Sequence, residues 1–147
     1  MPFRIRALEE SDFANGFLEA LGSLSDVGLN LAEAADIWKQ RTAAGIHSIV
    51  AEIDGRVVGT ASLIVEKKYI HRGGLVGHIE DVAVHADFWR QGIGTALVDE
   101  LTHLAESLHC YKVILNCLDH LVPFYVRLGY KRHDSGLRCN LPRGETV

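Results

Sequence analysis

The chain has 147 residues, of which 48% are hydrophobic and 23% charged, and its formal net charge is -4. This length and composition indicate one globular domain with a hydrophobic core, spanning residues 1–147. The negative charge argues against a broad nucleic-acid surface, and no apolar run is long enough to span a bilayer, so we expect neither partner.

The cysteines and histidines give no sign of a metal site. Cys110, Cys117 and Cys139 form no C-x-x-C pair, and the eight histidines show no zinc-binding spacing. The first residues lack the apolar core of a signal peptide. We therefore expect reduced thiols, no metal and a cytoplasmic enzyme.

The first half of the chain alternates between strand and helix patterns. Its predicted elements are a strand over residues 3–8, a helix over 9–24, a helix over 31–45 and a hairpin over 47–67. Ser11 or Asp12 is the expected cap of the first helix, and Gly45 the end of the second. The turn of the hairpin is expected at Asp54 and Gly55.

The second half continues in the same way. Its predicted elements are a polar loop over residues 67–76, a strand over 77–84, a helix over 90–109, a strand over 111–118, a helix over 123–129 and a hairpin or edge strand over 130–141. The strand over 111–118 is almost continuously apolar, which predicts a central position buried on both faces. Pro123 and Gly129 bound the short helix. The whole order predicts an α/β fold, a mixed and mostly antiparallel sheet with helices on both faces.

A glycine-containing loop joins the strand over 77–84 to the long helix. Gly92 and Gly94 allow positive φ and close approach of a ligand, and the first N–H groups of the helix carry the positive end of its dipole. This predicts a pyrophosphate site to which Arg90, Gln91 and Thr95 add side-chain donors. The alternative is a tight turn that binds nothing. The third glycine of a dinucleotide fingerprint and the G-K-[ST] of a nucleotide loop are both absent.

The run R-x-G-x-G after a strand resembles the coenzyme A loop of the GNAT acetyltransferase superfamily. Together with further runs, the chain resembles the glucosamine 6-phosphate N-acetyltransferase family from about residue 3 to residue 139. These runs are K-K-Y-I-H at 67–71, G-H-I-E-D-V at 77–82, C-Y-K at 110–112 and F-Y at 124–125. The resemblance implies the GNAT fold and direct acetyl transfer from acetyl-CoA to the amine of glucosamine 6-phosphate in a ternary complex, for UDP-N-acetylglucosamine synthesis.

The resemblance also implies which residues bind the coenzyme. Backbone N–H groups of the strand over 77–84 would hold the pantetheine arm and the thioester carbonyl, where one donor typically contributes ~2.7–4 kcal/mol in the transition state. The residues so assigned are Val82, Ala83, Val84, Arg90, Gln91, Gly92, Ile93, Gly94, Thr95, Asn116 and Tyr125. This chain departs from the superfamily at Trp89, where Gln or Arg is usual.

The catalytic residues that the resemblance implies are Glu80, Asn116 and Tyr125. Tyr125 would protonate the leaving thiolate; the alternative is a core aromatic residue with a satisfied hydroxyl. The family has Asp or Glu at the position of Asn116, whose amide can hydrogen-bond but is not a base. We expect Asn116 to orient the sugar or the amine and to tolerate replacement by Asp. The proton of the amine would then leave through water or Glu80.

The acceptor site is expected around two adjacent carboxylates. Glu80 and Asp81 would point to opposite faces of a regular strand, and the resemblance implies a β-bulge that brings both to the sugar. The further substrate residues it implies are Lys68, His71, Tyr111, Lys112 and Arg138, with Arg143 as a second choice for the last. In the family such an arginine reaches the site of the other subunit, so the resemblance implies a homodimer.

Two alternatives stay open on the sequence alone. One is a GNAT enzyme that acetylates another amine, such as a protein N-terminus or an aminoglycoside. The other is a non-catalytic acetyl-CoA-binding module, which the departures at Trp89 and Asn116 leave possible. A panel of acceptors separates these alternatives from the amino-sugar enzyme.

Overall fold

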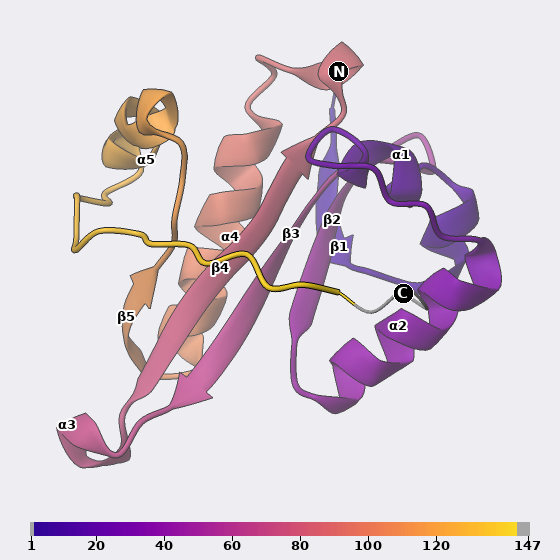
Figure 1. Ribbon diagram of the computed structural model, residues 1–147. Coiled ribbons are helices and arrows are strands. Elements are labelled where there is room, and N and C mark those ends of the chain that lie inside the picture. Colours follow the sequence, from indigo (N-terminus) through magenta and orange to yellow (C-terminus); the bar gives the residue numbers. More distant parts are fainter. Residues whose placement is uncertain (1, 144–147) are drawn as a thin grey trace. The chain divides into compact units, whose positions relative to one another are not determined.

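The computed structural model describes residues 2–143. Their contacts divide the chain into two compact units, Met1–Leu115 and Asn116–Val147. The first unit holds the sheet and helices α1 to α4, and the second holds α5 (Figure 1). A single domain over the whole chain stays a prediction.

The first unit is built on a five-stranded sheet of order β1-β2-β3-β4-β5. The strands are β1 (Arg4–Ala7), β2 (His47–Ile53), β3 (Arg56–Lys67), β4 (Leu75–Val84) and β5 (Cys110–Ile114). Neighbours pair antiparallel from β1 to β4, and β5 pairs parallel with β4. The expected mixed, mostly antiparallel sheet is confirmed.

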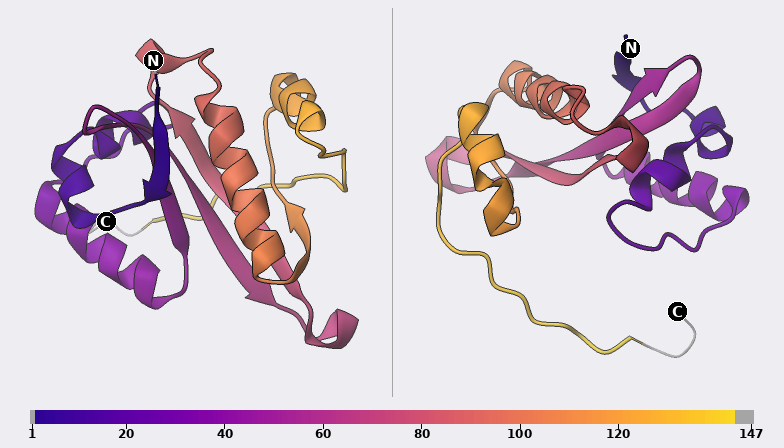
Figure 2. Two further views of the ribbon diagram at one scale, coloured as in Figure 1. Left: turned by 180° about the vertical axis from the view of Figure 1, so that it is seen from behind. Right: turned by 90° about the horizontal axis from the view of Figure 1, so that it is seen from above.

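Helices of the first unit cover both faces of this sheet, as expected. The first unit holds α1 (Phe17–Leu21), α2 (Leu31–Ala43), α3 (Ile70–Gly73) and α4 (Ile93–Ser107), with 3-10 turns η1 (Glu10–Ala14) and η2 (Ala86–Phe88). The second unit holds α5 (Val122–Arg127) and the 3-10 turn η3 (Asp119–Leu121). Within the first unit, α1 and α2 lie against one face of the sheet and α4 against the other (Figure 2).

The predicted helix over residues 9–24 is two elements, η1 and α1. The break lies at Gly16, whose φ of +104° is left-handed, and the Val57 N–H donates to the carbonyl of Asn15 at 2.8 Å. The residue before the first turn is Glu9, and the carboxylate of Asp12 accepts its N–H at 2.8 Å. The expected cap at Ser11 or Asp12 is therefore wrong by two or three positions.

Two strand predictions are also wrong. The strand over 111–118 is the shorter β5, which lies at the edge of the sheet and leaves Tyr111 and Lys112 exposed. A continuous apolar run does not tell an edge from a centre, because neighbours in the sheet are chosen by tertiary pairing. No strand forms over 130–141, where the described residues of this chain provide no pairing partner for a strand.

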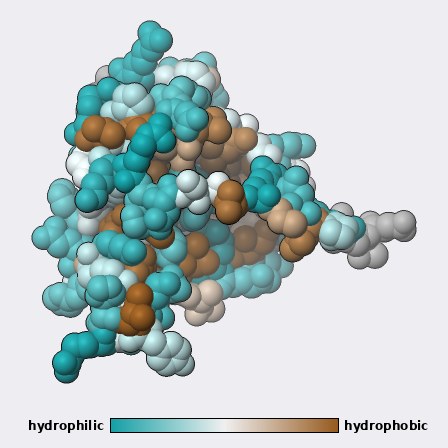
Figure 3. All heavy atoms as spheres, turned by 60° about the vertical axis from the view of Figure 1, so that its left-hand side comes forward, coloured by the Kyte–Doolittle hydropathy of each residue, from teal (hydrophilic) through white to brown (hydrophobic). Residues whose placement is uncertain are grey.

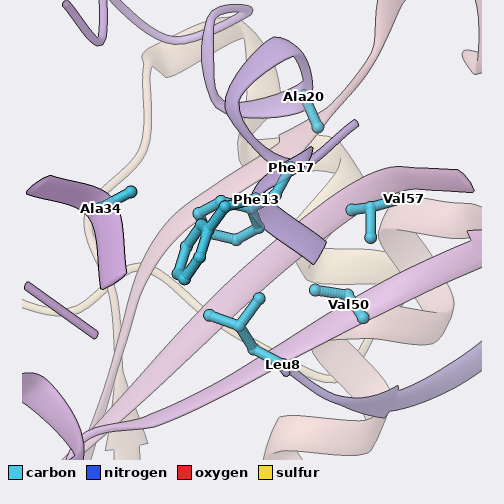
Figure 4. Packing of buried hydrophobic residues seen from close by; sticks show 7 residues of the cluster. All are labelled: Leu8, Phe13, Phe17, Ala20, Ala34, Val50 and Val57. Carbon is cyan, nitrogen blue, oxygen red and sulfur yellow. The ribbon is translucent and has the colours of Figure 1, made fainter. Parts of the chain in front are cut away.

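The core between α1, α2 and the sheet contains packed aromatic rings. The rings of Phe13 and Phe17 meet edge to face with centroids 5.2 Å apart, and Trp38 lies 6.4 Å from Phe13. The cluster they join consists of Leu8, Phe13, Phe17, Ala20, Ala34, Val50 and Val57 (Figure 4). On the opposite face, α4 buries Leu97 and Leu101 completely. These two layers fix the position of β4 between them.

Candidate active site

Strands β4 and β5 separate part of the way along β4. They pair only from Leu75 to His78 on β4, although β4 continues to Val84. In the described part of the chain, no strand pairs with the edge of β4 beyond His78 on that side. The edge of β4 beyond His78 is therefore open, and the binding of the pantetheine arm there, which the family resemblance implies, stays a prediction.

A β-bulge lies in β4 at the two predicted carboxylates. The register between β3 and β4 shifts between Thr60 and Ser62, so that Asp81 and Val82 together oppose one residue of β3. Asp81 has a φ of +53°, and both Glu80 and Asp81 are exposed. The bulge implied by the family resemblance is confirmed, and the shared use of both carboxylates by the sugar stays a prediction.

The hydrogen bonds between β3 and β4 beyond the bulge show which backbone groups of β4 face the open edge. The His85 N–H donates to the Val58 carbonyl at 2.8 Å. Because alternate residues of an antiparallel strand face the partner, Ala83 turns its N–H toward β3 and Val84 turns its N–H away. The Val84 carbonyl accepts from the Trp89 indole at 2.6 Å. Of this pair, Val84 rather than Ala83 offers a donor to a ligand.

The loop before α4 has the geometry of an anion site. Arg90 has a φ of +64° and Gly92 a φ of +82°, and Gly92 directly precedes the 15-residue helix. A Cβ on Gly92 would meet no atom within 4 Å, so the positive φ rather than crowding favours glycine there. Left-handed residues in a turn can direct successive backbone N–H groups to one point. The N–H groups of Ile93 and Gly94 lie at the positive end of the helix dipole of α4, which also favours an anion. Arg90 and Gln91 are exposed beside them.

A second group of predicted residues gathers where α3 meets the start of β5. We call Lys68, His71, Tyr111 and Lys112 the basic cluster. The rings of His71 and Tyr111 have centroids 4.2 Å apart, and Lys112 Nζ lies 5.8 Å from the Tyr111 centroid. The Lys68 N–H donates to the Gly74 carbonyl at 2.8 Å, and a Cβ on Gly74 would lie 2.7 Å from the Tyr111 ring.

Glu66 pairs with one residue of this cluster, Lys68, and was missed from the sequence. Its carboxylate contacts His78 Nε2 at 2.9 Å and Lys68 Nζ at 3.1 Å. The hydrogen bond from His78, followed by that from Lys68, lowers the pKa of Glu66. The carboxylate therefore stays ionised and holds Lys68 in place. The hairpin pairing of β3 with β4 was the signal that could have revealed this contact.

The basic cluster and the bulge lie far apart within one chain. Ser62 is opposite Glu80, whereas Lys67 is opposite Leu75. The five steps from Ser62 to Lys67 span about 17 Å of strand. This exceeds what one hexose phosphate can bridge, so a single chain does not bring these two groups of predicted substrate residues together.

The second unit contains Tyr125 and Asn116. Tyr125 is 8% exposed and its ring packs against Phe124 and Tyr130, with centroids 4.9 and 6.1 Å away. Burial, followed by the proximity of Cys117 and Tyr130, raises the pKa of Tyr125, so its hydroxyl keeps its proton at neutral pH. Asn116 is exposed.

The predicted phosphate-binding arginine also lies in the second unit. Arg138 donates from Nε to Asn140 Oδ1 at 2.6 Å, and both side chains are exposed. The two side chains therefore meet, although the strand that was expected to place them on one face does not form.

Comparison with known proteins identifies the family. A family model described as the acetyltransferase (GNAT) family matches residues 8–130. A Trypanosoma brucei brucei protein named glucosamine 6-phosphate N-acetyltransferase is 41% identical over 140 residues, which cover 93% of this chain and 95% of the relative. A Candida albicans protein of the same name is 38% identical, with 92% of each chain covered.

The chain belongs to the glucosamine 6-phosphate N-acetyltransferase family.

A solved structure of a glucosamine 6-phosphate N-acetyltransferase supports the same assignment. The Arabidopsis thaliana crystal structure superposes with a TM-score of 0.93 at 32% identity, covering 97% of this chain and 100% of that one. The GNAT fold and an acyltransferase activity, both expected from the sequence, are thereby confirmed.

The chain departs from the GNAT pattern at Trp89, and the structure shows what replaces the usual side chain. The indole folds back to the Val84 carbonyl and leaves Arg90 and Gln91 exposed at the loop. The backbone geometry of the loop is kept. Among residues 2–143, no group of three or more His, Cys, Asp or Glu could hold a metal ion. No helix in the same range is long and apolar enough to cross a membrane.

Proposed function

We propose that the chain transfers the acetyl group of acetyl-CoA to the amine of D-glucosamine 6-phosphate by direct attack in a ternary complex. The product, N-acetylglucosamine 6-phosphate, would serve UDP-N-acetylglucosamine synthesis. The observation that carries this proposal is the bulged end of β4, where Glu80 and Asp81 lie next to an open strand edge. The carboxylates can accept hydrogen bonds from the attacking amine, and an unpaired backbone N–H can donate to the thioester carbonyl.

In this proposal, the coenzyme binds along β4 and the loop before α4. The N–H groups of Ile93, Gly94 and Thr95 receive the pyrophosphate, assisted by Arg90 and Gln91, because the first turn of a helix has unpaired donors. The open edge of β4 at Val82 and Val84 receives the pantetheine arm. A backbone N–H directed at the thioester carbonyl contributes ~2.7–4 kcal/mol to the transition state.

The chemistry then needs two proton transfers. The amine attacks the thioester carbon, the C–N bond forms, and the amine proton leaves through water or Glu80. The C–S bond breaks, and the thiolate takes the proton of Tyr125, whose raised pKa keeps that proton available. Asn116 orients the sugar or the amine, and Asp81 accepts hydrogen bonds from sugar hydroxyls.

We further propose a homodimer in which each site receives the basic cluster, or Arg138, of a second copy. The separation of about 17 Å within one chain supports this arrangement. Apolar side chains in the second unit are exposed, namely Leu118 (67%), Leu137 (97%) and Leu141 (78%). Figure 3 shows one face of the molecule with hydrophobic side chains gathered in patches between hydrophilic ones. Such patches suit a protein partner.

Thiol release from acetyl-CoA tests the function. Purified protein is given glucosamine 6-phosphate, glucosamine, an aminoglycoside or a peptide amine. We expect turnover with the phosphorylated sugar and much weaker turnover with the others. Preference for another amine would point to the first alternative, and tight acetyl-CoA binding without turnover would point to a non-catalytic module.

A further inference from the structure

A cavity of about 120 Å³ lies in the first unit, between α2 and the sheet. Phe13, Phe17 and Trp38 are among its apolar walls. Its polar walls are Arg41, Ser48, Thr60, Ser62 and Asp81. Because Asp81, the bulged residue of β4, is one of these polar walls, the cavity adjoins the candidate active site.

Arg41 is held by hydroxyl groups and not by a carboxylate. Its Nη2 donates to Ser62 Oγ at 2.8 Å and to Ser48 Oγ at 3.4 Å, and these two hydroxyls lie 3.4 Å apart. Within residues 2–143, the guanidinium makes no ion pair. A guanidinium has five N–H donors, so most of them stay available to a ligand.

The guanidinium of Arg41 also lies near the two carboxylates at which the acceptor sugar is proposed to bind. Ser62, its hydrogen-bond partner, is the residue opposite Glu80 in the sheet. Arg41 is the only cationic side chain among the described residues that line the cavity. The basic cluster, in contrast, lies about 17 Å along β3 from this point. Within one chain, Arg41 therefore lies closer to Glu80 and Asp81 than the basic cluster does.

We propose that Arg41, Ser48 and Ser62 form an anion-binding subsite that holds the phosphate of the acceptor sugar in the same chain that holds its amine. A guanidinium flanked by two hydroxyls suits the oxygens of a phosphate, which it binds through charge-assisted hydrogen bonds. The apolar walls lower the local dielectric and strengthen this pairing. The subsite rests on the proposed function, whose acceptor carries the phosphate, and it adds a contact in the same chain to those of the second copy.

A simpler role for Arg41 is to stabilise the C-terminal end of α2, since it lies in the last turn of that helix. That role requires only a positive charge and predicts no difference between acceptors with and without phosphate. The two roles therefore differ in a measurable way.

The test compares Arg41→Gln and Arg41→Lys with the wild type. Lys39→Gln serves as a matched control, because Lys39 is on the same helix but its side chain is 66% exposed and outside the cavity. In Arg41→Gln we expect KM for glucosamine 6-phosphate to rise about tenfold or more, with kcat and the KM for glucosamine nearly unchanged. The KM of Arg41→Lys for glucosamine 6-phosphate should lie between those of the wild type and Arg41→Gln, and the KM of Lys39→Gln should match that of the wild type. An equal change for both sugars, or none for either, would overturn the subsite.

A binding measurement separates this subsite from the proposed function. Calorimetry with inorganic phosphate needs no turnover, and we expect Arg41→Gln to weaken binding about tenfold or more. If the wild type binds phosphate through Arg41 but does not acetylate the sugar, the function fails and the subsite stands. If turnover is normal and phosphate binding is the same in both proteins, the subsite fails and the function stands. Ser62→Ala replaces Arg41→Gln if the latter does not unfold cooperatively, and it should weaken phosphate binding in the same direction.

Discussion

Tyr125 combines burial with a hydroxyl that stays protonated. It is 8% exposed, and its pKa is raised by burial, with Cys117 and Tyr130 adding to the shift. A buried phenol of this kind is suited to giving a proton to a leaving thiolate, and a pH change within the neutral range does not remove that proton. The sequence identified this residue only through the family pattern, because a Tyr in a short helix is equally typical of a core.

We expect Tyr125→Phe to lower kcat about 100-fold with a smaller change in KM, since the proton is needed only when the C–S bond breaks. Steady-state kinetics with glucosamine 6-phosphate measure this. Tyr69→Phe is the matched control, because its side chain is fully exposed at 102%. An unchanged kcat would exclude Tyr125 as the acid or show that another step limits the rate.

The proposed coenzyme site is the junction of β4 and α4, and the geometry of this junction depends on one glycine. We expect Gly92→Val to weaken acetyl-CoA binding about tenfold or more, because a β-branched residue is strained at a φ of +82° and shifts the donors of the loop. The fold should survive, at a cost of about 1–3 kcal/mol. Calorimetric titration with acetyl-CoA measures the effect.

Gly45→Val controls for the strain itself. Gly45 has a φ of +78°, and a Cβ there would also meet no atom within 4 Å, but it follows α2 instead of preceding α4. It should lose similar stability and keep its coenzyme affinity. Equal losses of affinity in both variants would remove the special role of the loop before α4.

The start of the chain is tied to the sheet by an ion pair between β1 and η1. Arg6 donates to both carboxylate oxygens of Asp12 at 2.8 Å, and the Glu9 N–H adds a third bond. Burial alone would raise the pKa of Asp12, but the bonds from Arg6 and Glu9 outweigh it and lower the pKa below its usual 3.8. The lowered pKa means that this pair stabilises the fold above about pH 4 and is lost as the pH falls through the folded value.

We expect Asp12→Asn to reduce the free energy of unfolding by about 1.5–3 kcal/mol at pH 7, because it weakens the charge-assisted hydrogen bonds from Arg6, which keeps its ion pair with Glu52. The difference from the wild type should shrink as the pH falls below about 4, where Asp12 itself becomes protonated. Urea unfolding at both pH values checks this, with Glu10→Gln as an exposed control from the same segment. A difference that is constant with pH would mean that the charge of Asp12 is not what matters.

At the scale of the whole molecule, the proposed site needs parts from two chains. We expect Glu80→Gln and Lys68→Gln each to be nearly inactive alone. After unfolding and refolding together in equal amounts, about a quarter of the wild-type activity should return, since half of the dimers are then mixed and one of their two sites is intact. Activity that stays at the level of the separate variants would show that both residues act within one chain.

Much of this protein follows from its sequence. The hairpin at Asp54 and Gly55, the helix ending before Gly45 and the glycine-containing junction ahead of α4 all follow from local backbone preferences. These preferences act over a few residues and need no distant contact. The family pattern then added Glu80, Asp81 and Tyr125, and it implied the bulge that the register of β3 and β4 confirms.

Only the tertiary structure showed which elements and side chains that are distant in the sequence lie next to each other. Local preference favoured one helix from residue 9 to 24, but the bond from Val57 to the carbonyl before Gly16 divides it. The apolar run of β5 did not reveal its edge position, because sheet order is set by pairing over long distances. For the same reason the sequence did not reveal that Arg41 meets Ser62, 21 residues away, or that Glu66 holds Lys68 and His78. Residue type and spacing determine which elements form, whereas only the packed sheet determines which charged side chains share one site.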